Sequence, residues 1–113
     1  MELFTANLEQ DMPTVEKARI RMDQALRSAR AKGCKAVKLI HGYGSSGSGG
    51  AIKKEVLSEL GRRQRAGKIK TYVPGEEFSP FYPSARLALE RCPFLSRDRD
   101  YSASNHGITI VVL

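Results

Sequence analysis

The sequence predicts a single α/β domain over residues 1–113, a two-layer sandwich in which a mixed four-stranded sheet packs against two main helices. Apolar residues recur at helical spacing in two segments, and short β-branched runs lie before, between and after them. A chain of 12.5 kDa buries roughly two thirds of its unfolded surface, which suffices for one modest core. We therefore expect the order β-α-β-α-β-β, with a long connection before the last strand.

The first half of the chain contains two strand–helix units. Residues 2–8 are an extended segment that ends in a turn. A helix is predicted over 13–32, where apolar residues recur at steps of three and four and Pro13 suits the first helical position. A buried strand over 36–40 and a second helix over 51–65 follow.

The second half contains two further strands and a long connection. Residues 69–73 and 108–113 have the β-branched and aromatic character of strands. The segment 75–106 between them is rich in proline and aromatic residues, and connections this long are often lids or binding loops. Because such segments usually pack, we expect most of its rings to hold it against the sheet, with a short helix over 85–91.

Positive charge is concentrated in the middle of the chain. The whole sequence carries 19 Lys and Arg against 12 Asp and Glu, a net charge of +7. Residues 27–70 hold 12 of the basic groups and only two acidic ones. Such a stretch is typical of proteins that meet phosphates, and DNA or RNA is then the partner; a merely solvated basic surface is the alternative.

Composition also argues against several classes of protein. No apolar run approaches the ~20 residues that cross a membrane, and the first residues lack the pattern of a secretory signal. Cys34 and Cys92 are too few for a disulfide framework and have no second ligand at metal spacing. We expect a cytoplasmic protein without a zinc site. Its oligomeric state is not indicated by the sequence.

The most informative segment is a glycine- and serine-rich turn that joins the predicted strand at 36–40 to the predicted helix at 51–65. Such a turn exposes unpaired N–H groups beside the positive end of a helix dipole, and glycine lets the backbone approach a phosphate closely. Lysines in the first helical turn lean toward the same anion. The predicted phosphate-binding residues of this turn and of the basic segment are Gly42, Tyr43, Gly44, Ser45, Ser46, Gly49, Gly50, Lys38, Lys53, Lys54, Arg62 and Arg63.

His41 stands where the strand ends and this turn begins. An imidazole at the mouth of an anion site acts as general acid or base on a phosphodiester, or donates to a phosphate oxygen. A histidine that only hydrogen-bonds its own turn is the alternative. The turn is not a Walker A loop, because Gly50 stands where that motif needs lysine. Tyr43 is the lone aromatic residue of the basic segment, so we expect recognition of backbone or shape.

Four segments together resemble the small MutS-related (Smr) domain family. They are Thr14-Val15-Glu16-Lys17-Ala18, Leu39-Ile40-His41-Gly42-Tyr43-Gly44, Ile52-Lys53 and Gly107-Ile108-Thr109-Ile110-Val111-Val112-Leu113. The resemblance covers most of the chain except 75–104, where a longer connection replaces the usual short one. It implies a two-layer α/β sandwich that binds nucleic acid, several members being nucleases that nick DNA or cut RNA. It also implies that the loop with His41, Gly42 and Gly44 lies at the active or binding face.

A second motif of this family is changed in the chain. Members carry Asp-x-His in a Leu-Asp-Leu-His-Gly pattern, which is linked to cleavage, whereas the chain has Leu8-Glu9-Gln10-Asp11-Met12 in register. Asp11 replaces the histidine, and a carboxylate with an ordinary pKa near ~4 does not donate a proton at neutral pH. If the chain cleaves, we expect His41 to transfer the proton and Glu9 to orient it or a metal. Glu9 and Asp11 together are a candidate pair for a divalent cation, or else an ordinary turn before a helix.

Three functions stay open at this point. The first is nucleic-acid binding with DNA or RNA endonuclease activity. The second is a noncatalytic nucleic-acid or ribosome binding module, in which Asp11 marks lost chemistry. The third is a binding protein for a small phosphorylated ligand. Salt dependence separates them, because a site that neutralises ~5 phosphates loses affinity with a log–log slope near −4, and a single-phosphate site with a much shallower one.

Overall fold

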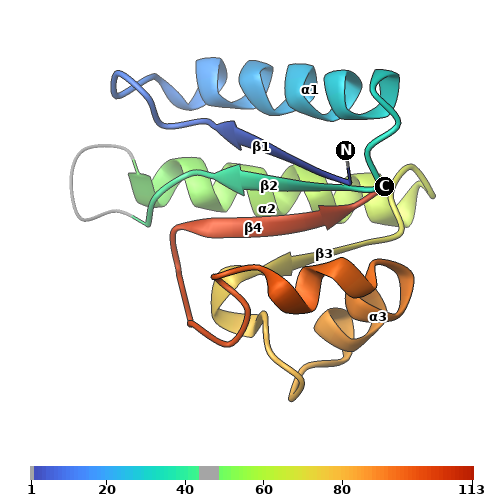
Figure 1. The fold of residues 1–113 in the computed structure, drawn as a ribbon. Coiled ribbons are helices and arrows are strands. Elements are labelled where there is room, and N and C mark those ends of the chain that lie inside the picture. Colours follow the sequence, from blue (N-terminus) through green and yellow to red (C-terminus); the bar gives the residue numbers. More distant parts are fainter. Residues whose placement is uncertain (1, 44–48) are drawn as a thin grey trace.

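The computed structural model describes residues 2–43 and 49–113 of the chain (Figure 1). In chain order its elements are β1 (Leu3–Asn7), α1 (Val15–Ala31), β2 (Ala36–Ile40), α2 (Gly49–Arg65), β3 (Thr71–Pro74), η1 (Gly75–Glu77), α3 (Pro83–Arg91), η2 (Pro93–Arg97) and β4 (Ile108–Val112), where η marks a 3₁₀ turn. Each helix and strand that the sequence predicts is present, and α2 begins two residues earlier than expected.

The boundaries of α1 follow from local chemistry. The Thr14 hydroxyl accepts a hydrogen bond from the backbone N–H of Lys17 at 3.1 Å and caps the first turn. At the other end Gly33 has a φ of 72°, the left-handed conformation that stops a helix at low cost when the residue is glycine. The helix therefore ends where the sequence predicts.

The sheet is mixed, with the strand order β1-β2-β4-β3. β1 pairs with β2 in parallel, and β4 runs antiparallel to both of its neighbours, β2 and β3. The fold class is thus confirmed as a single α/β domain with a four-stranded mixed sheet. The pairing of Ile40 with Ile108 aligns the end of β2 with the start of β4, which brings the residues after β2 beside the residues before β4.

Helices cover both faces of the sheet. α1 and α2 pack against one face, over Val37, Leu39 and Val111, and α3 covers the other, over Ala36 and Val112 (Figure 1). The structure therefore has a third layer beyond the two expected, built by the segment that the sequence treats as a connection. None of the helices in the described residues is long and apolar enough to cross a membrane.

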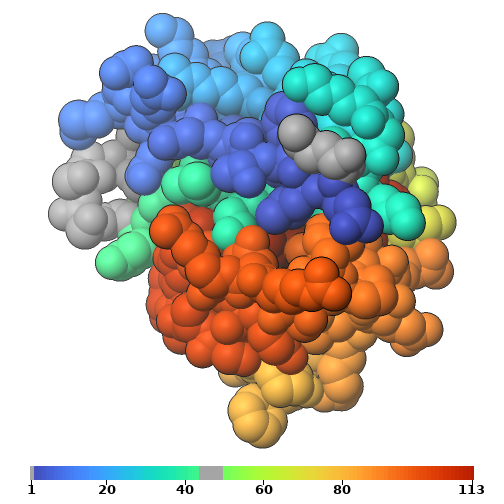
Figure 2. Space-filling view, in the orientation of Figure 1, coloured from blue at the N-terminus to red at the C-terminus, as the bar shows by residue number. Residues whose placement is uncertain are grey.

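The segment 75–106 packs chiefly as scaffold. Phe78 is fully buried and meets the ring of Tyr101 edge-on, with centroids 5.2 Å apart. Phe81 and Tyr82 are exceptions to the expected packing, because their rings are 85% and 41% exposed. Figure 2 shows this segment, in yellow and orange, as the lower part of the molecular surface.

Candidate functional site

The candidate site lies at the end of the sheet where β2 finishes and β4 begins. The backbone N–H groups of His41 and Gly42 both donate to the carbonyl of Gly107, at 2.9 and 3.1 Å. Gly42 has a φ of 71°, and a Cβ placed there would lie 2.2 Å from Glu9 Oε2. Only glycine therefore lets the Glu9 carboxylate lie against this turn. The structure thus brings Glu9 beside the turn that contains His41, as the proposed pairing of these two residues requires.

A cavity of about 230 Å³ opens at this point. Its lining includes Glu9, Gly42, Tyr43, Arg99, Asn105 and Gly107. Three hydrogen bonds connect residues of this region. The Lys38 ammonium donates to Asp100 at 2.7 Å, and Asn105 donates to the same carboxylate at 3.0 Å. The Gly107 N–H donates to Asn105 at 2.9 Å. The cavity is consequently tied to a buried ion pair in the interior.

The His41 imidazole is buried beneath the turn rather than placed at its mouth. Its side chain has no exposed surface, Nδ1 lies 2.6 Å from the Gly42 carbonyl oxygen, and Nε2 lies 2.8 Å from Thr109 Oγ1. Since a carbonyl only accepts, Nδ1 carries the proton and Nε2 accepts from the Thr109 hydroxyl. Burial lowers the pKa of His41 and outweighs the hydrogen bond to Gly42, which acts in the opposite direction. The ring is therefore a neutral structural group that organises the turn in this structure.

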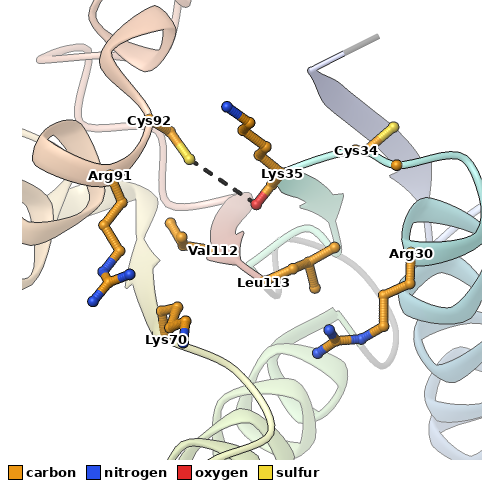
Figure 3. A pocket seen from close by; sticks show the side chains of 9 residues that line it. Arg30, Cys34, Lys35, Lys70, Arg91, Cys92, Val112 and Leu113 are labelled. Carbon is orange, nitrogen blue, oxygen red and sulfur yellow. Dashed lines mark hydrogen bonds between the residues drawn. The ribbon is translucent and has the colours of Figure 1, made fainter.

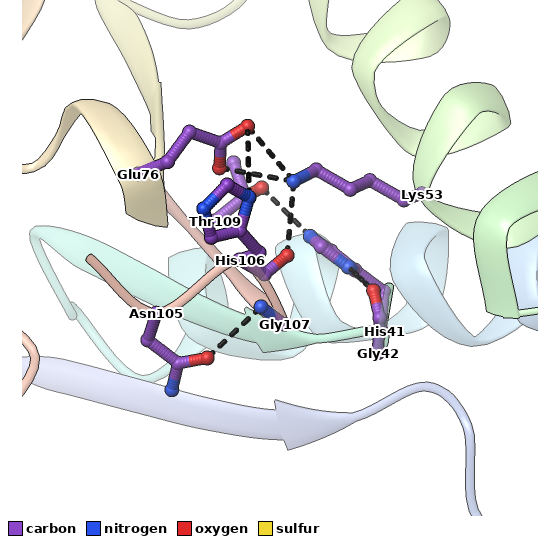
Figure 4. Close-up of polar contacts among 8 residues, drawn as sticks. All are labelled: His41, Gly42, Lys53, Glu76, Asn105, His106, Gly107 and Thr109. Atoms are coloured by element: carbon purple, nitrogen blue, oxygen red, sulfur yellow. Dashed lines mark hydrogen bonds and ion pairs between the residues drawn. The ribbon is translucent and has the colours of Figure 1, made fainter. Parts of the chain in front are cut away.

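Lys53 faces the same region but its charge is already paired (Figure 4). Its ammonium donates to both carboxylate oxygens of Glu76 and to the carbonyl of His106, each at 2.9 Å. Partial burial raises the pKa of Glu76. The hydrogen bonds that its carboxylate accepts from Lys53 and from the backbone lower it by more, so this pKa lies below its ordinary value. Glu76 is thus an ionised partner of Lys53 at neutral pH.

Three other predicted phosphate-binding cations also have carboxylate partners. Lys38 lines the same cavity, but its side chain is buried and its ammonium lies 2.6 Å from Asp98 and 2.7 Å from Asp100, so its charge is already paired. Arg63 pairs with Asp23 of α1 at 2.6 Å, and Arg62, which is exposed, pairs with Glu59 at 2.8 Å. Lys54 is exposed and forms no ion pair with a described carboxylate. The positive stretch of the sequence is therefore neutralised in part within the fold.

The remaining predicted residues belong to the turn itself. Gly42 and Tyr43 line the cavity, and Gly49 and Gly50 are the first residues of α2. Gly44, Ser45 and Ser46 lie outside the described residues. Among the residues that are described, no group of three or more His, Cys, Asp or Glu side chains is arranged to hold a metal ion.

Sequence reasoning missed two residues at this site, His106 and Arg99. The His106 side chain is 54% exposed, its Nδ1 lies 4.0 Å from Glu76 Oε2, and its ring centroid lies 6.2 Å from that of Tyr43. Arg99 lines the cavity and forms no ion pair with a described carboxylate. The antiparallel pairing of β4 with β2 places both near the turn, and the only sequence signal for this pairing was a final strand that begins just after His106.

Comparisons with known proteins agree with this geometry. The family model described as Smr domain matches residues 10–77 of the chain. Endonuclease MutS2 of Thermus thermophilus is 36% identical over 63 residues, which are 56% of this chain and 8% of that protein, so the chain spans only a small part of its relative's length.

A solved structure gives the same assignment of fold. The crystal structure of the Smr domain of Thermus thermophilus MutS2 covers 100% of this chain and 98% of its own, with a TM-score of 0.57 and 23% sequence identity. At that identity the likeness shows the fold alone. Since the family model covers more than half of the chain and includes both the first helix and the histidine–glycine turn, the chain belongs to the Smr domain family.

Proposed function

We propose that this chain binds nucleic acid, in a single-stranded segment of RNA or DNA, at the end of the sheet where Tyr43 and His106 emerge. The observation that carries the proposal is this exposed pair of rings, 61% and 54% exposed, which stand 6.2 Å apart at an interplanar angle of 56°. Membership of the Smr family supports the same partner class.

The two rings change the mode of recognition that the sequence favoured. Tyr43 was the lone aromatic residue of the basic segment, which argued for contacts to backbone or shape only. His106 adds a second ring from outside that segment. Unpaired bases stack on exposed aromatic and histidine rings, whereas bases in a duplex are already stacked on each other. The pair therefore favours single strands over duplexes.

Lys54 and Arg99 supply the charge for phosphate contacts. Each lacks a carboxylate partner among the described residues, unlike Lys38 and Lys53. Arg99 lines the cavity and Lys54 is exposed on α2, and two phosphate contacts from these cations give a log–log salt slope of roughly −1 to −2 for single-strand binding. This slope is shallower than the value of about −4 that five contacts would give.

The test is fluorescence anisotropy with labelled single-stranded RNA, duplex DNA and branched DNA at several salt concentrations. Tyr43→Ala should weaken single-strand binding about 5- to 150-fold, as loss of about 1–3 kcal/mol of stacking implies. Arg99→Gln should weaken binding to all three nucleic acids, while Arg97→Gln, an exposed neighbour on η2 that does not line the cavity, should leave it unchanged. Equal affinity of wild type, Tyr43→Ala and Arg99→Gln would contradict the proposal.

Endonuclease activity is a second candidate function. The relative whose Smr region this chain resembles is called an endonuclease, and the observation here that favours cleavage is the imidazole of His106, exposed and 4.0 Å from the ionised Glu76. A histidine oriented by a carboxylate is a common general acid or base, and an exposed one reaches a substrate. His106 rather than His41 is then the proton-transfer residue.

Cleavage is tested on the same substrates with and without Mg²⁺ or Mn²⁺. His106→Gln should abolish cleavage and retain most of the binding, whereas His41→Gln should lower the unfolding temperature and affect cleavage only as far as folding is lost. Cleavage that survives His106→Gln and disappears in a folded His41→Gln would return the role to His41. Binding without any cleavage would make the chain a noncatalytic module.

A further inference from the structure

A larger cavity lies at the opposite end of the sheet from the candidate site. It has a volume of about 410 Å³ and opens where β2 and β3 begin and β4 ends (Figure 3). Pockets of about 300–1,000 Å³ are the usual size for small ligands. The two cavities share no lining residue in the described part of the chain, so this one is separate from the nucleic-acid site.

Among the described residues, four cations and no acidic side chain line this cavity. They are Arg30, Lys35, Lys70 and Arg91, and none of them forms an ion pair with a carboxylate in the described part of the chain. Arg30 donates to the backbone carbonyl of Lys68. In Figure 3 the guanidinium groups of Arg30 and Arg91 lie on either side of Val112 and Leu113. By contrast, ion pairs with carboxylates are formed by Lys38, Lys53, Arg62 and Arg63.

Helix dipoles explain only half of this set. Arg30 and Arg91 stand in the last turns of α1 and α3, where the carbonyl end of a helix favours a cation. Lys35 and Lys70 lie outside the helices, immediately before β2 and β3. Four like charges around one cavity repel each other, and an anion in the cavity relieves that repulsion.

The floor of the cavity is apolar. Cys34, Cys92 and Val112 line it and are all at least nine-tenths buried. Burial raises the pKa of the Cys92 thiol, against the opposing charge of Lys35, so this thiol stays neutral and does not offset the cations. Glu2 also acts on that thiol, but its side chain does not line the cavity. A ligand with a charged part and an uncharged part matches such a surface.

We propose that this cavity is a second anion site that binds a phosphate ester carrying at least two negative charges, such as a nucleoside diphosphate. The phosphates contact Lys70 and Arg91, which Figure 3 shows on the same side of Val112, and the uncharged part of the ligand lies on the apolar floor. Guanidinium groups suit this role because their paired N–H donors match phosphate oxygens. A stretch of nucleic-acid backbone has the same phosphate chemistry, and the experiment separates the two sources.

Calorimetric titration at low salt tests the site with pyrophosphate, ADP and a single-stranded oligonucleotide. The double variant Lys70→Gln/Arg91→Gln removes two of the four cations, and Lys17→Gln/Arg97→Gln removes two exposed charges that do not line the cavity. The first variant should weaken pyrophosphate and ADP about tenfold or more, since each lost contact to a charged group is worth about that factor. The second should bind as wild type does, and equal unfolding temperatures show that both fold.

Each outcome decides the proposal. Tighter binding of ADP than of pyrophosphate, lost in Lys70→Gln/Arg91→Gln, supports a small phosphorylated ligand that uses the floor. Loss of oligonucleotide affinity alone in this variant supports the same anion site with nucleic-acid backbone as its source. Unchanged affinity for all three probes, or no binding of any probe by the wild type, overturns it. Tyr43→Ala, which tests the candidate site, should leave pyrophosphate binding unchanged.

Discussion

The two faces of the sheet are built on different principles, although consecutive residues of one strand form them. Leu39 points into an aliphatic layer under α1 and α2, together with residues such as Leu26 and Leu60. Lys38, its neighbour, points to the face that α3 covers, where its ammonium is enclosed with Asp98 and Asp100. One face is stabilised by apolar burial and the other also depends on a buried ion cluster.

The ion cluster of Lys38, Asp98 and Asp100 fixes the position of residues at the candidate site. Asp98 and Asp100 belong to the segment that carries Arg99, Asn105 and His106 to the site, and Lys38 fixes that segment to β2. Asn105 donates a hydrogen bond to Asp100 and accepts one from the Gly107 N–H, and so connects the ion cluster to the glycine turn. A buried ion pair is a weak source of net stability, but it specifies one arrangement of the groups that form it. We expect the ion cluster to determine site geometry and the aliphatic face to supply most of the stability.

The largest expected effect comes from breaking the ion cluster. Lys38→Met leaves two buried carboxylates unpaired and should cost about 3–5 kcal/mol of unfolding free energy at neutral pH, measured by urea denaturation. Leu39→Ala, the matched change on the other face, should cost about 2–5 kcal/mol. The two differ in their rescue: Asp98→Asn/Asp100→Asn should recover much of the loss in Lys38→Met and nothing in Leu39→Ala. Absence of that rescue would show that the cluster is not the cause.

A smaller loss of stability is expected from removing the Thr109 hydroxyl, which lies on the face of the sheet that α1 and α2 cover. Thr109→Val leaves His41 Nε2 without its donor and should cost about 1–3 kcal/mol in the same denaturation experiment. Thr71→Val is the control, because Thr71 is also buried in the sheet but pairs with Val112, at the other end of β4 from Thr109. Equal costs for the two substitutions would argue against an organising role for His41.

The smallest effect is a difference in pH dependence between the faces. The pKa of His41 is lowered by burial from 6.5, so its contribution to stability is present above about pH 6.5 and is lost as the pH falls, because the unfolded chain then binds the proton first. Burial works to raise the pKa of Asp100, but hydrogen bonds from Lys38 and Asn105 bring it below 3.8. Its contribution is therefore present above about pH 3.8 and is lost at lower pH.

Denaturation curves from neutral to acidic pH separate the two windows. Each group contributes a slope of up to about 1.4 kcal/mol per pH unit. His41→Gln should remove the slope that sets in as the pH falls below about 6.5. Lys38→Met/Asp98→Asn/Asp100→Asn should flatten the more acidic part and leave the upper part intact. A profile that His41→Gln does not alter would contradict the assignment of the upper window to the imidazole.

The sequence predicted the elements well because their signals are local. The apolar stripe of 15–31, the Thr14 cap and the β-branched run at 108–112 all act within a few residues. The segment 75–106 was harder, since its short helix and 3₁₀ turns have weak periodicity, and its role as a third layer depends on contact with the opposite face of the sheet. The turn at Gly42 lies where the sequence predicts it; its φ of 71° favours glycine, and the Glu9 carboxylate, which comes from before the first helix, packs against it.

The family, the order of the elements and the position of the histidine–glycine turn can be read from the sequence, because each depends on spacing along the chain. Which charges are paired and which histidine is exposed follow from the folded arrangement instead. Lys38 is neutralised by residues 60 and 62 positions away, His41 is buried against Thr109, and His106 is exposed beside Tyr43. The physical reason is that ion pairing and burial are set by neighbours in space, and antiparallel pairing of β4 with β2 chooses those neighbours.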